Sequence, residues 1–223
     1  MATTADVDLD DFLEAMAPRP DPIQREMADR AATEGFPIVG PVVGGVLYQL
    51  ALATDATRIF EFGSGFGYSA YWMARALDGD GHIVLTEEDP DELAAAESFF
   101  RRGGHDGVAR FAVGDAMDVI EDTDGPFDLV HIDHDKARYP DAFEAVRGAV
   151  SPGGVVVADN AIRAGPMDTA GLVAAFVGDE PVDLDATTEG VRRYLAAVRD
   201  AEAFVTTVLP VGSGIAVSVR RPD

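Results

Sequence analysis

The chain has 223 residues, which suits one large domain, and its 47% apolar residues are enough to bury a substantial core. It contains no cysteine, which excludes disulfide frameworks and thiolate metal sites. Its 40 acidic residues against 17 basic ones give a formal charge of −23, a balance poorly suited to the phosphate backbones of nucleic acids.

The N-terminal quarter, residues 1–57, looks largely helical, and its polar, acidic start does not resemble a secretory signal. The longest uncharged stretch, 38–54, contains glycine, proline and glutamine and falls short of the roughly 18 consecutive apolar residues of a membrane span. We therefore expect a single domain in which 1–57 form a helical cap on the core, 58–223. We also expect a cytoplasmic protein with no membrane partner.

Apolar strand-like runs alternate with helix-like stretches through the middle of the chain. The predicted elements are strand 58–62, helix 68–77, strand 82–86, helix 90–102, strand 110–113, strand 127–132, helix 139–150 and strand 155–159. Continuous apolar strands in such an alternation indicate a parallel sheet that is covered on both faces.

The C-terminal part has a different pattern. A predicted helix, 191–200, is followed by strands 203–209 and 215–220, which a short turn joins into an antiparallel hairpin at the sheet edge. Five parallel strands followed by such a hairpin are typical of class I methyltransferases and not of dehydrogenases. We therefore predict an α/β, Rossmann-like fold with a seven-stranded, mostly parallel sheet and helices on both faces.

A glycine-rich turn follows the first predicted strand. Gly63, Gly65 and Gly67 lie there at the carboxyl edge of the sheet, where ligands bind, and they allow a close approach of the backbone. The start of the next helix, near Ser69, offers free N–H groups to a carboxylate. The spacing G-x-G-x-G, preceded by the acidic Glu61, differs from the dinucleotide pattern G-x-G-x-x-G. It favours S-adenosylmethionine (SAM) as the cofactor.

Two further acids follow successive strands. Glu87 ends the second predicted strand, where a carboxylate can accept hydrogen bonds from both ribose hydroxyls of a cofactor. NAD enzymes require a carboxylate at the same place. Asp115 follows the third strand and could accept a hydrogen bond from the adenine amino group. Solvated loop acids are the alternative in so acidic a chain, but the position after successive strands favours a cofactor role.

Oxygen-bearing side chains follow the fourth and fifth strands. Asp133 ends one strand, and Asp159 and Asn160 end the next, so neighbouring strands would bring the three together. Oxygen-only ligands suit a hard divalent cation, Mg²⁺ first and Mn²⁺ or Ca²⁺ as alternatives. Such a cation keeps positions open for two adjacent acceptor oxygens. The alternative is ordinary decoration of loops by charged residues, which explains Asn160 poorly.

A solitary lysine stands three residues after the first of these ligands. Sixteen of the 17 basic residues are arginine, and the exception is Lys136. Unlike arginine, lysine can lose its proton and act as a base, so Lys136 is a candidate to deprotonate an acceptor hydroxyl. A chance exposed lysine is the alternative. His134 is a candidate to lie near the metal or the substrate, whereas His131, inside the strand, is expected to pack in the core.

These residues resemble a known family, the cation-dependent O-methyltransferases that include catechol and caffeoyl-CoA O-methyltransferases. The most specific segments are FEFGSGFGYSA, FDLVHIDHDKARYP and SPGGVVVADN. The resemblance implies that Asp133, Asp159 and Asn160 bind the metal, that Lys136 is the base, and that a homodimer forms. The cofactor contacts that we expect are Val39, Glu61, Gly63, Gly65, Gly67, Ser69, Glu87, Asp115 and Asp133. Segment 161–189, where the family shapes its acceptor pocket, has no clear match.

We therefore predict a SAM-dependent, divalent-metal-dependent O-methyltransferase that acts on one hydroxyl of a small phenolic, catechol-like acceptor, with Asp133 and Lys136 as catalytic residues. One alternative is a tRNA hydroxyuridine methyltransferase, against which the scarcity of basic residues argues. Others are a non-catalytic SAM-binding domain and, as the weakest, an NAD oxidoreductase.

The strong negative charge also suggests where the protein works. At low salt, self-repulsion among so many acids opposes a compact state, whereas at about 1 M salt the screening length falls to roughly 3 Å. We therefore expect a salt-rich cytoplasm and a halophilic source, with an acidic mesophilic protein as the alternative.

Overall fold

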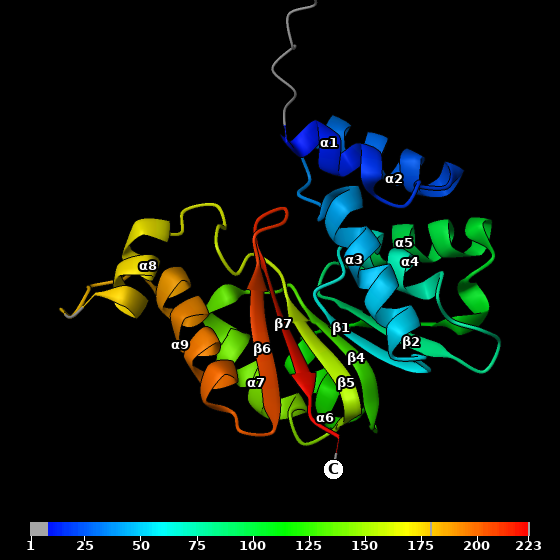
Figure 1. Ribbon diagram of the computed structural model, residues 1–223. Coiled ribbons are helices and arrows are strands. Elements are labelled where there is room, and N and C mark those ends of the chain that lie inside the picture. The colour runs from blue at the N-terminus through cyan, green and yellow to red at the C-terminus, as the bar shows by residue number, and fades with distance from the viewer. Residues whose placement is uncertain (1–8, 179, 223) are drawn as a thin grey trace, which may run out of the picture.

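The computed structural model describes residues 9–178 and 180–222, and the strands within these ranges form one seven-stranded sheet (Figure 1). The strands are β1 (Arg58–Phe62), β2 (His82–Glu87), β3 (Ala109–Val113), β4 (Phe127–Ile132), β5 (Val150–Ala158), β6 (Phe204–Leu209) and β7 (Ile215–Arg220). Their order is β3-β2-β1-β4-β5-β7-β6. Strands β1 to β5 are parallel, and β7 runs antiparallel to both β5 and β6. The predicted sheet with its antiparallel hairpin is confirmed, and with it the class I methyltransferase fold.

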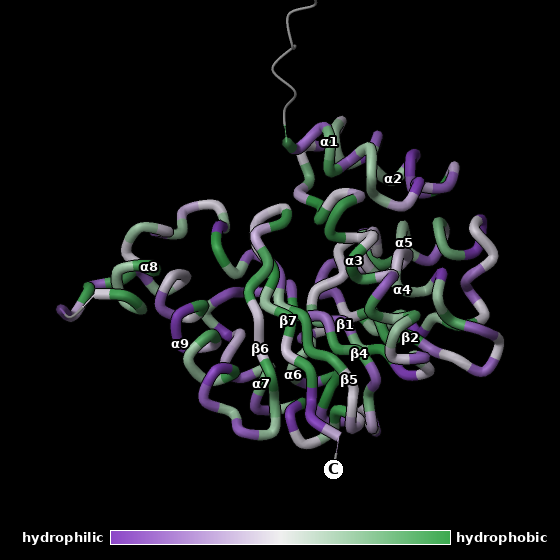
Figure 2. The backbone as a smooth tube through the Cα atoms, viewed as in Figure 1, coloured by the Kyte–Doolittle hydropathy of each residue, from purple (hydrophilic) through white to green (hydrophobic). Residues whose placement is uncertain are grey.

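Helices cover both faces of the sheet. They are α1 (Leu9–Met16), α2 (Pro22–Glu34), α3 (Gly40–Ala53), α4 (Tyr68–Ala74), α5 (Pro90–Gly103), α6 (Ala116–Glu121), α7 (Tyr139–Val146), α8 (Thr169–Val177) and α9 (Ala186–Asp200), with short 3₁₀ turns η1 (Asp106–Val108) and η2 (Lys136–Arg138). One apolar cluster joins α3, α4 and α5 to one face, and a second joins α6, α7 and α9 to the other. In Figure 2, β7 and α8 are largely hydrophobic along their length, whereas α2 and α9 show long hydrophilic stretches.

The register aligns the carboxyl ends of the central strands. Phe62 of β1 lies opposite Thr86 of β2 and Ile132 of β4, and Ile132 lies opposite Ala158 of β5. The residues that follow these strands therefore share one edge of the sheet, which is where ligands bind in this class of fold.

The N-terminal helices pack beside this edge. Asp21 begins α2 with a reciprocal capping box, because its side chain accepts from the Gln24 N–H and the Gln24 side chain accepts from the Asp21 N–H. Gly35, with φ of 67°, ends the helix, and the chain then turns into the loop 36–39. Among the described helices none is both long and apolar enough to cross a membrane. The treatment of 1–57 as a cap stays a prediction, and residues 1–8 lie outside the described part.

Some predicted boundaries differ from the structure. Strands 58–62, 127–132 and 215–220 are confirmed to the residue. The predicted helix 139–150 was too long, because α7 ends at Val146 and β5 already begins at Val150. β5 bends at Gly153, whose φ is 82°, and its pairing with β4 shifts register there, so local patterning revealed only its apolar second half. Helices α6 and α8 were not predicted.

Candidate active site

A cavity of about 530 Å³ lies at the carboxyl edge of the sheet. Loops that follow each of the parallel strands form its wall, together with the loop 36–39 and the β6–β7 turn. The predicted site residues that line it are Val39, Gly63, Gly65, Ser69, Glu87, Asp115, Asp133, Lys136, Asp159 and Asn160. Two predicted contacts, Glu61 and Gly67, are not part of this wall. Apart from these two, the predicted cofactor and metal residues therefore share one cavity.

The glycine turn has the backbone that its composition suggests. Gly63 adopts a φ of 79°, and a Cβ there would stand 2.8 Å from the carbonyl oxygen of Asp133. Gly67, with φ of 84°, faces Ala96 and Phe100 of α5 instead of the cavity. Gly63 thus lets the first loop touch the fourth, while Gly67 serves the packing of α4 on α5.

Glu61 lies one layer below the cavity. Its side chain is fully buried, and its Oε1 accepts hydrogen bonds from Ser69 Oγ at 2.5 Å and from His131 Nδ1 at 2.9 Å. Burial by itself lowers the pKa of His131, but the hydrogen bond and the negative charge of Glu61 outweigh it, so that the pKa is raised. Glu61 therefore reaches the cavity through Ser69. The prediction that His131 packs in the core is confirmed, but its pairing with Glu61 was not foreseen.

Glu87 is held rigidly at the end of β2. Its Oε2 accepts from the Gly65 N–H at 2.8 Å, and its Oε1 accepts from the N–H groups of Glu88 and Asp89 at 2.9 and 3.1 Å. These backbone donors fix the carboxylate in place on the cavity wall without using its full capacity to accept hydrogen bonds. It is thus prepared to accept hydroxyl donors from a ligand.

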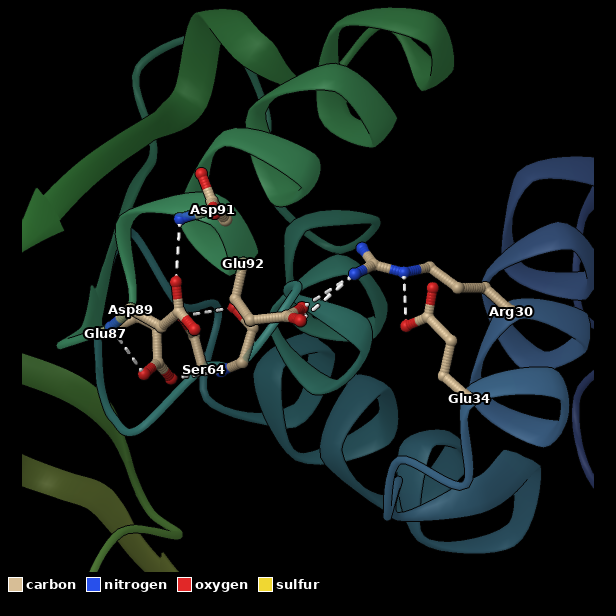
Figure 3. A network of polar contacts seen from close by, with 8 residues as sticks. Arg30, Glu34, Ser64, Glu87, Asp89, Asp91 and Glu92 are labelled. Carbon is tan, nitrogen blue, oxygen red and sulfur yellow. Dashed lines mark hydrogen bonds and ion pairs between the residues drawn. The ribbon is translucent and has the colours of Figure 1, made fainter.

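An ion-pair network beside Glu87 ties α2 to α5. Figure 3 shows Arg30 of α2 reaching Glu34 on its own helix and Glu92 on α5, at 2.9 and 3.0 Å. The Arg30 guanidinium also lies 4.7 Å from the centre of the Phe66 ring. The network fixes the helix that leads into the loop 36–39 and thereby one side of the cavity. Arg30 carries no signal in the local sequence, because its partner Glu92 is 62 residues away.

Asp115 forms an ion pair with Arg138, a residue that the sequence did not single out. Its Oδ2 accepts from Arg138 Nη1 at 2.7 Å, and its Oδ1 accepts from the Met117 N–H at 2.9 Å. The hydrogen bond from Arg138, with that from Met117, lowers the pKa of Asp115. Arg138 also lines the cavity. Asp115 is therefore an ionised, oriented carboxylate.

The loop after β4 brings Lys136 against Asp133. The Lys136 ammonium donates to Asp133 Oδ1 at 2.9 Å and to the carbonyl oxygen of His134 at 3.1 Å. The side chains of Lys136 and Asp133 are 18% and 25% exposed, so a small acceptor in the cavity could still reach both. The i,i+3 spacing noted in the sequence thus becomes a direct contact.

Asp159 is the buried member of the acid pair. Burial, with the charge of Asp133 next, raises its pKa to about 6. Its Oδ1 is buried and has no hydrogen-bond partner among the described residues. Asn160 follows in a left-handed conformation with φ of 54°, unusual for a residue other than glycine. The corner after β5 therefore holds a buried carboxylate oxygen that lacks a hydrogen-bond partner.

The oxygen-bearing side chains near Lys136 are suited to a divalent cation. Within the described ranges, no group of three or more His, Cys, Asp or Glu side chains is arranged to hold a metal. The predicted set has only two such residues, Asp133 and Asp159, and takes its third oxygen from the amide of Asn160. Two repelling carboxylates and an unpartnered oxygen are a donor set that a hard cation would satisfy. The residues therefore fit the group.

His134 forms an aromatic part of the wall. Its ring stacks on Tyr139 with centroids 5.6 Å apart and contacts Phe62 at 5.4 Å. Burial, followed by the charges of Arg138 and Lys136, lowers its pKa to about 4, so the ring is neutral near pH 7. It offers a flat, uncharged surface to a ligand.

The comparison with known proteins decides the family. The O-methyltransferase family matches residues 32–221. The chain belongs to this family. A catechol O-methyltransferase of Niastella koreensis is 34% identical over 184 residues, which cover 80% of this chain and 78% of that protein.

Solved structures agree with this assignment. The O-methyltransferase TomG of Streptomyces achromogenes, involved in tomaymycin synthesis and solved in complex with SAM, has a TM-score of 0.81 and 28% identity over 96% of both chains. An O-methyltransferase of Bacillus cereus in complex with SAH has a TM-score of 0.81 and 26% identity, covering 96% of this chain and 97% of that one. The chain is thus a SAM-dependent O-methyltransferase.

Proposed function

We propose that this enzyme transfers the methyl group of SAM to one of two adjacent hydroxyls of a small catechol-like phenol, with the help of a divalent cation. The observation that carries the proposal is the meeting of Asp133, Asp159 and Asn160 with Lys136 on the wall of one cavity. The name of the Niastella koreensis relative, a catechol O-methyltransferase, supports the same acceptor class.

Asp133, Asp159 and Asn160 would hold the cation. When bound, a divalent cation acts as a Lewis acid that lowers the pKa of an acceptor hydroxyl, and Mg²⁺ is the first candidate. Its charge would also offset the repulsion between the two carboxylates that raises the pKa of Asp159. Mn²⁺ and Ca²⁺ accept the same oxygen ligands.

Lys136 would receive the acceptor proton at Nζ. In the reaction, the bond between the methyl carbon and the SAM sulfur breaks as the carbon–oxygen bond forms, which yields S-adenosylhomocysteine and a methyl ether. Lys136 is already held 2.9 Å from Asp133, beside the predicted metal ligand. Its ammonium side chain could form an amine, whereas an arginine could not.

The cofactor would bind along the loops that follow β1, β2 and β3. Glu87, oriented by backbone N–H groups, would accept hydrogen bonds from the ribose hydroxyls. Asp115 would accept a hydrogen bond from the adenine amino group. Ser69 and Glu61 would receive the amino-acid end of SAM, near the start of α4. Val39, on the loop 36–39, would close the pocket beside them.

The test is a methyl-transfer assay with a panel of acceptors after complete metal removal and readdition. We expect a catechol to be methylated and its mono-methylated analogue to be unreactive. Activity should vanish without metal and return with Mg²⁺. The Asp133→Ala variant should lose both activity and Mn²⁺ binding by calorimetry, whereas Asp141→Asn, on an exposed site of α7, should lose neither. Undiminished transfer without metal would refute metal dependence. Methylation of deproteinised tRNA alone would favour the nucleic-acid alternative.

We also propose that the enzyme is a homodimer. Val205 of edge strand β6 pairs with Val219 of β7, and the two are 49% and 37% exposed. An apolar edge strand left open to water is a favoured place for association. Sedimentation should therefore give twice the chain mass, and Val205→Lys should shift it toward the monomer. A monomeric wild-type protein would refute this proposal.

A further inference from the structure

A buried histidine contacts Glu61, which lies just below the cavity wall and would, with Ser69, receive the amino-acid end of the cofactor. Glu61 of β1 and His131 of β4 are direct neighbours in the parallel register, and both side chains have 0% exposure. His131 Nδ1 lies 2.9 Å from Glu61 Oε1, the same oxygen that accepts from Ser69 Oγ. Because Ser69 lines the cavity, a chain of contacts runs from His131 through Glu61 to the ligand site.

Within the described residues, this series of contacts leaves one acceptor atom without a donor. Glu61 Oε2 is buried and has no hydrogen-bond partner, although its other oxygen has two. A buried carboxylate oxygen without a donor is costly, and native proteins rarely leave one. The α-ammonium of SAM is a cationic donor of the kind that this oxygen needs. Its place beside Ser69 and Glu61 is part of the proposed function.

His131 is positioned to control this carboxylate. Apolar side chains such as Leu129 occupy the same buried face of β4, and an apolar residue at 131 could fill the space without donating a hydrogen bond. The imidazole N–H instead fixes the orientation of Glu61 and compensates its burial. Without it, the carboxylate would lose one of its two donors and could turn away from Ser69.

We propose that His131 is a positioning residue for the cofactor, which holds Glu61 and, through it, Ser69 in the arrangement that receives the amino-acid end of SAM. The inference rests on the proposed placement of that end beside Glu61. It predicts that His131 affects only ligands that carry the amino-acid group.

The experiment compares the dissociation constants of SAM and of 5′-methylthioadenosine, which keeps the adenosine but lacks the amino-acid group. With His131→Phe, we expect SAM to bind about tenfold more weakly, the effect of one lost charge-assisted hydrogen bond, and 5′-methylthioadenosine to bind as before. His131→Asn, whose amide can place a donor near the position of Nδ1, should restore most of the affinity for SAM. Leu129→Ala is the matched control, and it should lower thermal stability without changing the ratio of the two constants.

The outcomes separate this inference from the proposed function. Equal weakening of both ligands by His131→Phe would show a merely structural role and overturn the inference. Glu61→Gln should also weaken SAM selectively, and adding His131→Phe to it should cause little further loss. If Glu61→Gln weakens the binding of SAM but His131→Phe does not, only the inference about His131 fails. If Glu61→Gln has no effect, the proposed cofactor placement itself fails. His131→Leu is the second donor-free variant in case His131→Phe does not fold.

Discussion

Gly190 of α9 lies directly on the backbone of Lys136. A Cβ built at Gly190 would stand 2.2 Å from the Lys136 carbonyl oxygen and 2.6 Å from Ala137 Cα. These contacts are with backbone, which cannot yield as the end of a flexible side chain can. The absence of a side chain at Gly190 therefore allows α9 to support the turn η2, from which the proposed base projects.

Gly190→Ala should displace η2 and with it Lys136. Intrinsic helix propensity would favour alanine by about 0.5–1 kcal/mol, so a fall in stability would show that the packing conflict wins. We expect a lower melting temperature and a reduced kcat, measured by calorimetry and by methyl transfer. Gly148→Ala is the matched control, because a Cβ there meets nothing within 4 Å. If Gly190→Ala behaves like this control, Gly190 does not support η2.

Lys136 is expected to be the base. Lys136→Ala should lower kcat about 10²- to 10⁴-fold, the usual contribution of general acid–base catalysis, while the KM for SAM changes little. Lys136→Arg should not restore the rate, because a guanidinium keeps its proton near neutral pH. Arg101→Ala, at an exposed ion pair on α5, serves as the control. Full activity in Lys136→Arg would mean that a positive charge, not a base, is what the site needs.

Asp128 should make stability depend on pH. Burial raises the pKa of its carboxyl, but hydrogen bonds from Thr57, Ser151 and Arg58 outweigh burial, so that the pKa lies below its ordinary 3.8. A lowered folded-state pKa gives stability that is present above the ordinary value and is lost as the pH falls through the folded one. We therefore expect the free energy of unfolding from urea titrations to fall below about pH 4.

The variant Asp128→Asn identifies the contribution of this carboxylate. At about pH 7 it should cost about 1–3 kcal/mol, because the backbone N–H groups of Thr57 and Arg58 lose a charged acceptor. The difference from wild type should shrink at acid pH, where both side chains are neutral. A difference that stays constant with pH would contradict the role of ionised Asp128.

Salt should stabilise the fold. With a formal charge of −23, repulsion among the acids is screened as the Debye length falls from about 10 Å at 0.1 M to roughly 3 Å at 1 M. We expect the melting temperature to rise by several degrees between about 0.1 M and 1 M KCl, scaling with ionic strength. Sucrose is the control, since it favours compact states without screening charge. A melting temperature that does not change with KCl concentration would contradict the expectation of a salt-adapted protein.

The sequence by itself determined most of the fold and placed ten of the predicted site residues on the cavity wall. Strands such as β1 and β4 are short apolar runs bounded by turns, and their positions follow from neighbours in the chain. The residues after parallel strands must meet at one edge, which is why the sequence alone places Gly63, Asp133 and Asp159 together. Asp133 and Lys136 are close because only three positions separate them.

Only the tertiary structure decided what lies behind and around that wall. Glu61 and His131 are 70 residues apart, Asp115 and Arg138 are 23 apart, and Arg30 and Glu92 are 62 apart. Such pairs depend on which strands are neighbours and on how helices cross, and local periodicity does not encode either. The contact of Gly190 with the Lys136 backbone is also set by tertiary packing. The sequence shows only a glycine within a helix, and the reason for it is the backbone that packs against it.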